Sequence, residues 1–197
     1  MKNLFNLNKA FLFMGIIICS LASCKNSDAK PEDTKDVATD KNEAQLDQVA
    51  SEDDEATFFV DIAEMDLTEI KLAELAQQKA TNLKVKEFAK MIVTDHANSS
   101  VELKNLADNR SLSLPTSLTD NGRADYNTLN EESGIDFDKK FVDMMVDAHE
   151  KAIRKMENAS EDNDKDETVK VWASNKIAAL TSHLQKAKML KEDLDKK

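Results

Sequence analysis

Cysteine is nearly absent from this sequence. Its two copies, Cys19 and Cys24, both lie near the N-terminus, ahead of the segment that we expect to fold. The folded segment therefore has no thiol for a disulfide, for a cysteine-ligated zinc cluster or for a nucleophile. Its stability must come from packing or from a bound ligand.

Glycine and proline are also scarce, with three and two copies. No glycine-rich phosphate loop, H-E-x-x-H motif or nucleophile elbow occurs. Ser99 and Ser100 lie near His96, but on a helical pattern without a loop that could hold an oxyanion. Alternating strand patterns are missing as well, so the pattern predicts an all-helical chain. We expect a protein that is not an enzyme.

Basic residues are in the minority, with 27 Lys and Arg against 38 Asp and Glu, and the formal net charge is −11. Loss of an N-terminal signal containing Lys2 and Lys9 would take this charge to −13. Such a chain repels nucleic acid and anionic lipid headgroups. We therefore expect no nucleic-acid partner, and the sequence indicates no particular protein partner.

Residues 1–23 have the pattern of an export signal. Lys2 and Lys9 precede an apolar stretch at residues 10–22, which is too short to span a bilayer. The stretch ends in L-A-S-C at residues 21–24, the form of a bacterial lipobox, so the sequence predicts cleavage before Cys24 and a lipid on that residue. An ordinary signal with a chance cysteine is the alternative. Lys25 is permissive for the outer membrane, where we expect the protein to face the periplasm or the surface.

Residues 24–55 are predicted to be a disordered acidic tether. Residues 25–55 hold eleven acidic residues, four lysines and no aromatic residue. Such a segment has little to bury and repels itself. As a coil it would span roughly 30 Å, which would hold the domain away from the membrane.

Residues 56–193 are predicted to form the folded domain. Helical periodicity indicates long helices at about 56–80, 83–109, 135–159 and 167–192, with Asn82 and Asp166 as N-caps. Short turns would pair these helices into two antiparallel hairpins. Residues 110–134 are too long for a turn and would cross the bundle, with a short helix near 123–131. We therefore predict an all-α, ferritin-like four-helix bundle.

One nonapeptide pattern occurs twice. FAKMIVTDH at residues 88–96 and FVDMMVDAH at residues 141–149 share F-x-x-M-[IM]-V-x-x-H. Heptad spacing places one ionisable residue near the middle of each apolar stripe. In chain order these residues are Glu69, His96, His149 and His183. Burial of such groups is costly unless they pair or bind an ion, so they are a candidate site for a divalent transition metal. Hydrogen-bonded histidines that complete the core are the alternative.

Antiparallel pairing gives the expected register of these residues. Across the first turn, His96 lies level with about residue 67, close to Glu69. Across the second turn, His183 lies level with about residue 143 and His149 with about residue 177. Six residues correspond to roughly 9 Å along the axis, too far for His149 and His183 to share an ion unless the loop geometry differs. The same register places Asp143 nearer His183.

The motif of di-iron carboxylate bundles is missing. Such sites use Glu-x-x-His on two helices, but the residues three before the histidines are Val93, Val146 and Leu180. Ferroxidase chemistry is therefore not expected. Asp95 and Glu150, beside two of the histidines, point about 100° away from the stripe and are expected to be solvated.

The sequence resembles domain-of-unknown-function family 4142, whose members are often labelled as outer-membrane proteins. Segments that carry the resemblance include EFAKMIVTDHANSSVELKNLA, FDKKFVDMMVDAHEKAI and KVWASNKIAALTSHLQKAKML. The resemblance implies an exported four-helix bundle of unassigned activity, commonly with Glu69 and the three histidines at matching positions. Asp147-Ala148-His149 departs from the more usual Asp-His order, so we expect the side chain of Asp147 to point elsewhere.

Two hypotheses of different class follow. In the first, the protein is a lipid-anchored cell-envelope module for interaction or stress, without catalysis, and its histidines complete the core. In the second, it binds a divalent transition metal through Glu69, His96, His149 and His183. No other cofactor is indicated.

Overall fold

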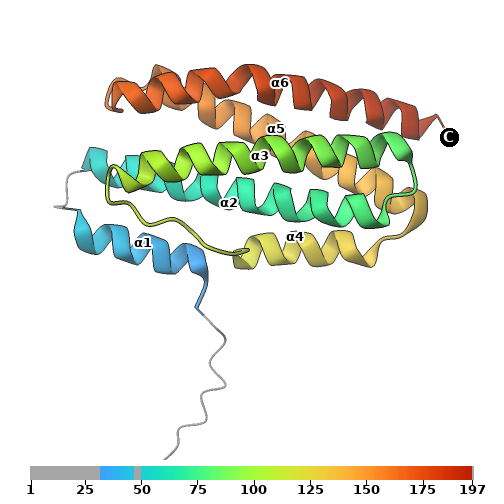
Figure 1. Ribbon diagram of the computed structural model, residues 1–197, viewed down its shortest axis with the longest axis horizontal. Helices are drawn as coiled ribbons and strands as arrows, with labels where there is room; N and C mark the ends of the chain where they lie inside the picture. Colours follow the sequence, from blue (N-terminus) through green and yellow to red (C-terminus); the bar gives the residue numbers. More distant parts are fainter. Residues whose placement is uncertain (1–31, 47–49, 197) are drawn as a thin grey trace, which may run out of the picture. The chain divides into compact units, whose positions relative to one another are not determined.

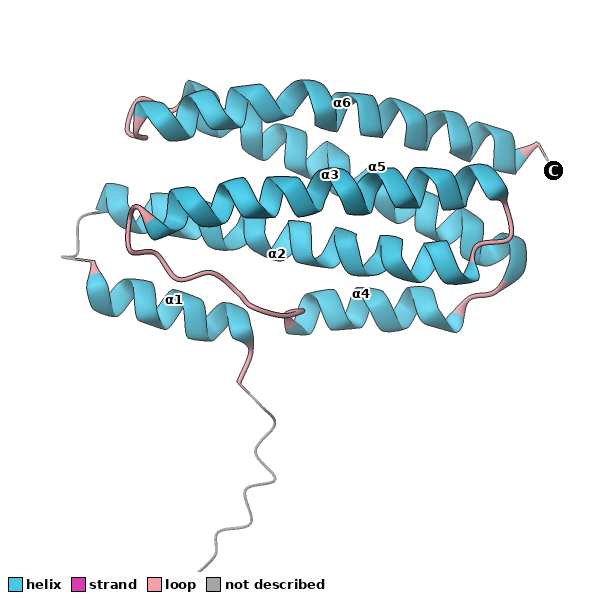
Figure 2. Ribbon diagram, in the orientation of Figure 1, coloured by secondary structure: helices cyan, strands magenta, loops and turns pink. Residues whose placement is uncertain are grey.

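The computed structural model describes residues 32–46 and 50–196, and these contain six helices and no strand (Figures 1 and 2). The helices are α1 (Thr34–Gln45), α2 (Ala50–Lys79), α3 (Leu83–Asp108), α4 (Asp120–Glu131), α5 (Gly134–Glu161) and α6 (Glu167–Asp195). The all-α class is confirmed for this part of the chain, and the four predicted long helices correspond to α2, α3, α5 and α6. The predicted signal and Cys24 lie outside the described residues.

The long helices form two pairs, α2 with α3 and α5 with α6, and the pairs contact each other through α2–α5 and α3–α6 (Figure 1). Both predicted N-caps are confirmed. The Asn82 side chain accepts from the Lys84 backbone N–H at 2.9 Å, and the Asp166 side chain accepts from that of Thr168 at 2.9 Å. Each cap satisfies an N–H that the first helical turn would leave unpaired. None of the described helices is both long and apolar enough to cross a membrane.

The predicted tether is wrong where the structure describes it, because helix α1 and the first turns of α2 lie within residues 24–55. Only Ala38 and Asn42 of α1 are buried, so the helix has no apolar stripe that periodicity could detect. Hydrogen bonds hold it instead. Asn42 donates to the Ser113 carbonyl at 3.0 Å and accepts from the Ser113 N–H at 2.7 Å.

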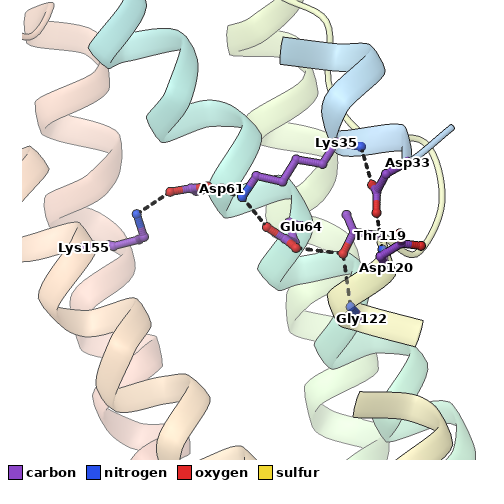
Figure 3. Close-up of polar contacts among 8 residues, drawn as sticks. All are labelled: Asp33, Lys35, Asp61, Glu64, Thr119, Asp120, Gly122 and Lys155. Atoms are coloured by element: carbon purple, nitrogen blue, oxygen red, sulfur yellow. Dashed lines mark hydrogen bonds and ion pairs between the residues drawn. The ribbon is translucent and has the colours of Figure 1, made fainter. Parts of the chain in front are cut away.

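A second polar contact joins α1 to α2 and α5 (Figure 3). Lys35 of α1 lies 2.7 Å from both Asp61 and Glu64 of α2, and Lys155 of α5 lies 2.7 Å from the other oxygen of Asp61. The Thr119 hydroxyl, at the N-cap of α4, donates to Glu64 at 2.7 Å. One α2 segment therefore binds three other parts of the fold through partly buried charges.

A buried carboxylate links the two helical pairs. Asp138 of α5 is fully buried and accepts from the Thr81 N–H at 2.9 Å, the Thr81 hydroxyl at 2.5 Å and the Asn82 N–H at 2.8 Å. Thr81 and Asn82 form the turn between α2 and α3. Asp138 therefore fixes this turn against α5.

The apolar core consists of two clusters. One contains Phe88, Phe137, Phe141 and Leu190, near the α2–α3 turn. The other contains Phe58, Phe59, Leu103 and Trp172, toward the α5–α6 turn. A layer of buried polar side chains separates them.

Candidate metal centre

The four residues singled out by the sequence form this polar layer. Glu69 on α2, His96 on α3, His149 on α5 and His183 on α6 are at most 4% exposed. Along each long helix, the buried apolar residues on one side of the polar residue belong to one cluster and those on the other side to the second. The layer therefore occupies the centre of the bundle, and each long helix contributes one member.

Each imidazole has one ring nitrogen held from outside the layer. His96 Nδ1 lies 2.8 Å from Asp66 Oδ1, His149 Nδ1 lies 2.8 Å from the Met145 carbonyl oxygen, and His183 Nε2 lies 2.9 Å from Asp95 Oδ2. A carboxylate or carbonyl at this position accepts the ring N–H and fixes the tautomer. The same arrangement orients histidines that bind metals.

The other ring nitrogens point inward and lie close together. His149 Nε2 is 3.2 Å from His183 Nδ1, and His96 Nε2 is 3.4 Å from Glu69 Oε2. One ligand nitrogen from each histidine can be chosen so that all three lie within 4.8 Å of one another. Two atoms bound at about 2.0–2.1 Å to one tetrahedral ion lie about 3.3 Å apart. The separations of 3.2 Å and 3.4 Å match this spacing. The histidine nitrogens that lie up to 4.8 Å apart would have to move closer to bind one ion.

A count of protons shows that the contacts of His149 and His183 are one proton short. His149 and His183 make three contacts in series, from the Met145 carbonyl through both rings to Asp95, and each contact needs a proton between its two atoms. Two neutral imidazoles supply two protons. If the outer nitrogens carry them, the lone pairs of His149 Nε2 and His183 Nδ1 face each other at 3.2 Å. A further proton or a metal ion between them would remove this repulsion.

Burial of the two rings opposes the binding of an additional proton. Burial lowers the pKa of His149 to about 3, and the charge of His96 contributes to this shift. Burial also lowers the pKa of His183, although Asp95 opposes the effect. Both shifts favour neutral rings at pH 7, so the facing nitrogens of His149 and His183 are a candidate position for a bound cation.

Glu69 and His96 also have unsatisfied atoms. Neither Glu69 oxygen nor His96 Nε2 has a hydrogen-bond partner, although all three atoms are buried. Burial raises the pKa of Glu69 to about 7, against the attraction of His96. Burial alone would lower the pKa of His96, but Glu69 and Asp66 outweigh it and raise this pKa to about 9. Buried polar atoms without partners are uncommon, and a bound ion is one explanation for them.

The predicted separation of His149 and His183 is wrong. The expected offset of roughly 9 Å treated the side chains as level with their own backbones. Helical side chains lean toward the N-terminus of their helix, and in an antiparallel pair the two lean directions are opposite. His183 lies farther from the α5–α6 turn than His149, so the two side chains lean toward each other. The contact of His149 with the Met145 carbonyl, one turn back, shows this lean.

Three aspartates have positions that differ in part from those expected from the sequence. Asp143 does not contact His183 and instead pairs with Lys191. Asp95, expected to be solvated, accepts from His183 while its side chain stays 45% exposed. Asp66 was not predicted, although the register placed residue 67 level with His96 and could have indicated it. The expected proximity of Glu69 and His96 is confirmed.

Two open spaces reach this layer, and Glu69 and Met65 line both. A cleft of about 490 Å³ lies among α1, α2, α4 and α5, beside the charged contacts of Figure 3. A smaller cavity of about 70 Å³ lies on the side of His96 and His183. The layer is buried but lies beside space that a small solute could occupy.

Comparison with known proteins gives the family. The model of the family described as a domain of unknown function, DUF4142, matches residues 38–190. The chain belongs to the DUF4142 family. The match includes most of α1, all four long helices up to Leu190 and the whole polar layer, so this layer lies within the DUF4142 domain.

The DUF4142 chain is also similar to solved structures. One is the "crystal structure of putative secreted protein DUF305 from Streptomyces coelicolor", with a TM-score of 0.61 and 15% sequence identity over 70% of this chain and 90% of that one. At this identity the likeness concerns the fold. None of the curated proteins matches the chain.

Proposed function

We propose that this DUF4142 protein binds a divalent transition-metal ion through His96, His149, His183 and Glu69. The observation that carries this proposal is the close approach of the inner nitrogens of His149 and His183, two buried rings, which lie 3.2 Å apart and within 4.8 Å of a ring nitrogen of His96. In addition, both oxygens of Glu69 and Nε2 of His96 are buried without a hydrogen bond, although Glu69 Oε2 lies 3.4 Å from His96 Nε2 and 3.3 Å from His149 Nδ1. Three imidazoles and one carboxylate suit zinc, iron, nickel or copper better than magnesium or calcium.

The fold proposed around this ion is the ferritin-like bundle. The two helical pairs and the long connection with α4 between them support this assignment. The absent Glu-x-x-His pairs weigh against di-iron chemistry. We therefore propose binding of a single ion and no enzymatic reaction.

We expect residues 25–197, purified, incubated with zinc and desalted, to retain about one zinc ion per chain. Zinc should also raise the melting temperature, because an ion that binds only the folded state stabilises it. His149→Gln should lose retention, since it removes a ligand, whereas Glu150→Gln should keep it. Glu150 follows His149 but pairs with Lys188 at the surface. Elemental analysis measures retention, and no bound zinc, iron, nickel or copper after this treatment would refute the proposal.

We also propose that the protein is lipid-anchored in the cell envelope, at the outer membrane, through Cys24. The L-A-S-C pattern at residues 21–24 after an apolar stretch supports this. Cys24→Ser should lose metabolic fatty-acid labelling and leave the membrane fraction. Cys19→Ser is the matched control and should behave as wild type. Equal labelling of wild type and Cys24→Ser would exclude this anchor.

A further inference from the structure

The small cavity is lined by both polar and apolar side chains. Three of the four proposed ligands, Glu69, His96 and His183, line it, whereas His149 does not. Its apolar lining residues include Ile62, Met65, Ala152, Met156 and Leu180. The cavity therefore adjoins the proposed ion.

The cavity is large enough for a small ligand. A site needs about 10–15 Å³ on this measure to hold a water molecule, and the cavity has about 70 Å³. Apolar cavities stay dry, but this one has the carboxylate of Glu69, which is buried and has neither oxygen hydrogen-bonded. One oxygen of Glu69 can bind the ion while the other accepts from a water molecule on it.

The cavity also reaches the surface between α3 and α6. Ala179 of α6, which lines it, is exposed, and the side chain of Asp95 of α3, which also lines it, is 45% exposed. Lys176 lines the same mouth and pairs with Glu102 at 2.6 Å. A small solute could enter here without displacing any of the four proposed ligands.

We propose that an ion held by the three histidines and one Glu69 oxygen takes a water molecule as a fifth ligand on the side of this cavity, and that small inorganic anions can replace this water. This inference rests on the proposed metal binding. A zinc ion with four protein ligands can expand to five positions where there is room for a further ligand. The cavity beside Glu69, His96 and His183 provides this room and limits the added ligand to a few atoms.

The test uses residues 25–197 loaded with cobalt(II), whose visible absorption reports its ligands, and azide as the probe. Added azide should change the visible spectrum of the wild type, and the change should reach a plateau as the azide concentration rises. Ala179→Leu narrows the mouth at an exposed helical position and should weaken the apparent azide affinity at least tenfold. Ala178→Leu is the matched control, because Ala178 is exposed on the same helix and does not line the cavity. Its azide affinity should equal that of the wild type.

Each outcome has a distinct meaning. Retained cobalt with no spectral response to azide in the wild type would overturn the exchangeable fifth ligand and leave the proposed metal binding intact. Absence of retained cobalt would overturn both. Equal azide affinity in the wild type and Ala179→Leu, with cobalt bound in both, would overturn the route through this cavity.

Discussion

Glu69→Met is expected to raise the free energy of unfolding of the metal-free protein by about 2 kcal/mol and to weaken its zinc binding at least tenfold. The carboxylate is buried without a hydrogen bond, and burial outweighs His96 in setting its pKa. The fold therefore disfavours the charged form, and one pKa unit corresponds to about 1.4 kcal/mol. Methionine has a similar length and no charge to desolvate. His96 keeps Asp66 as its partner at 2.8 Å.

This prediction separates the two roles considered for the polar layer. If the histidines and Glu69 served only to complete the core, removal of Glu69 would break a structural contact and lower stability. Denaturant unfolding with excess chelator at pH 8 measures the change. Glu74→Met on the same helix is the control, and it should change stability by less than about 0.5 kcal/mol because Glu74 pairs with Lys71 at the surface. A clear loss of stability in Glu69→Met would favour the structural role.

Asp138→Ala is expected to lower the free energy of unfolding by about 3 kcal/mol. The substitution removes three hydrogen bonds to a buried carboxylate, two of them from backbone N–H groups of the α2–α3 turn. Hydrogen bonds to charged groups contribute about 1.5–3 kcal/mol each, and solvent near the exposed Thr81 would recover part of the loss. Equilibrium unfolding in urea measures the change.

Two further variants show whether the hydrogen bonds cause this loss. Asp138→Asn keeps the volume but places an amide N–H₂ against a backbone donor, so it should lose about 2 kcal/mol. Asp136→Ala removes an exposed carboxylate two residues earlier on α5 and should cost less than about 1 kcal/mol. Stability within 0.5 kcal/mol of the wild type in Asp138→Ala would contradict the role given to this side chain.

The sequence predicted the long helices because each has a repeating apolar face and because Asn82 and Asp166 mark two helix starts by capping them. It missed α1 for a physical reason. Lys35 and Asn42 hold that helix through hydrogen bonds to residues of α2 and of the loop after α3, and such partners have no period in the sequence. Polar docking of this kind can be recognised only once both partners are placed.

The candidate site was predictable in composition but not in geometry. Glu69 and the three histidines stand out because each interrupts an apolar stripe. Their contacts depend on side-chain lean and on which helices are neighbours, and neither follows from spacing alone. Asp95 shows this, because its contact with His183 requires α3 and α6 to lie side by side.

The polar layer between the two apolar clusters also has a consequence for folding. Apolar stripes alone permit long helices to slide past one another by one turn, about 5.4 Å, and to pack almost as well. In this bundle, such a slip would move a histidine or Glu69 from the layer into a cluster of phenylalanine and leucine side chains, without a partner. The layer therefore specifies the register of the four helices, as a buried polar residue specifies register in coiled coils. We expect that it selects one alignment of the four helices even before an ion binds.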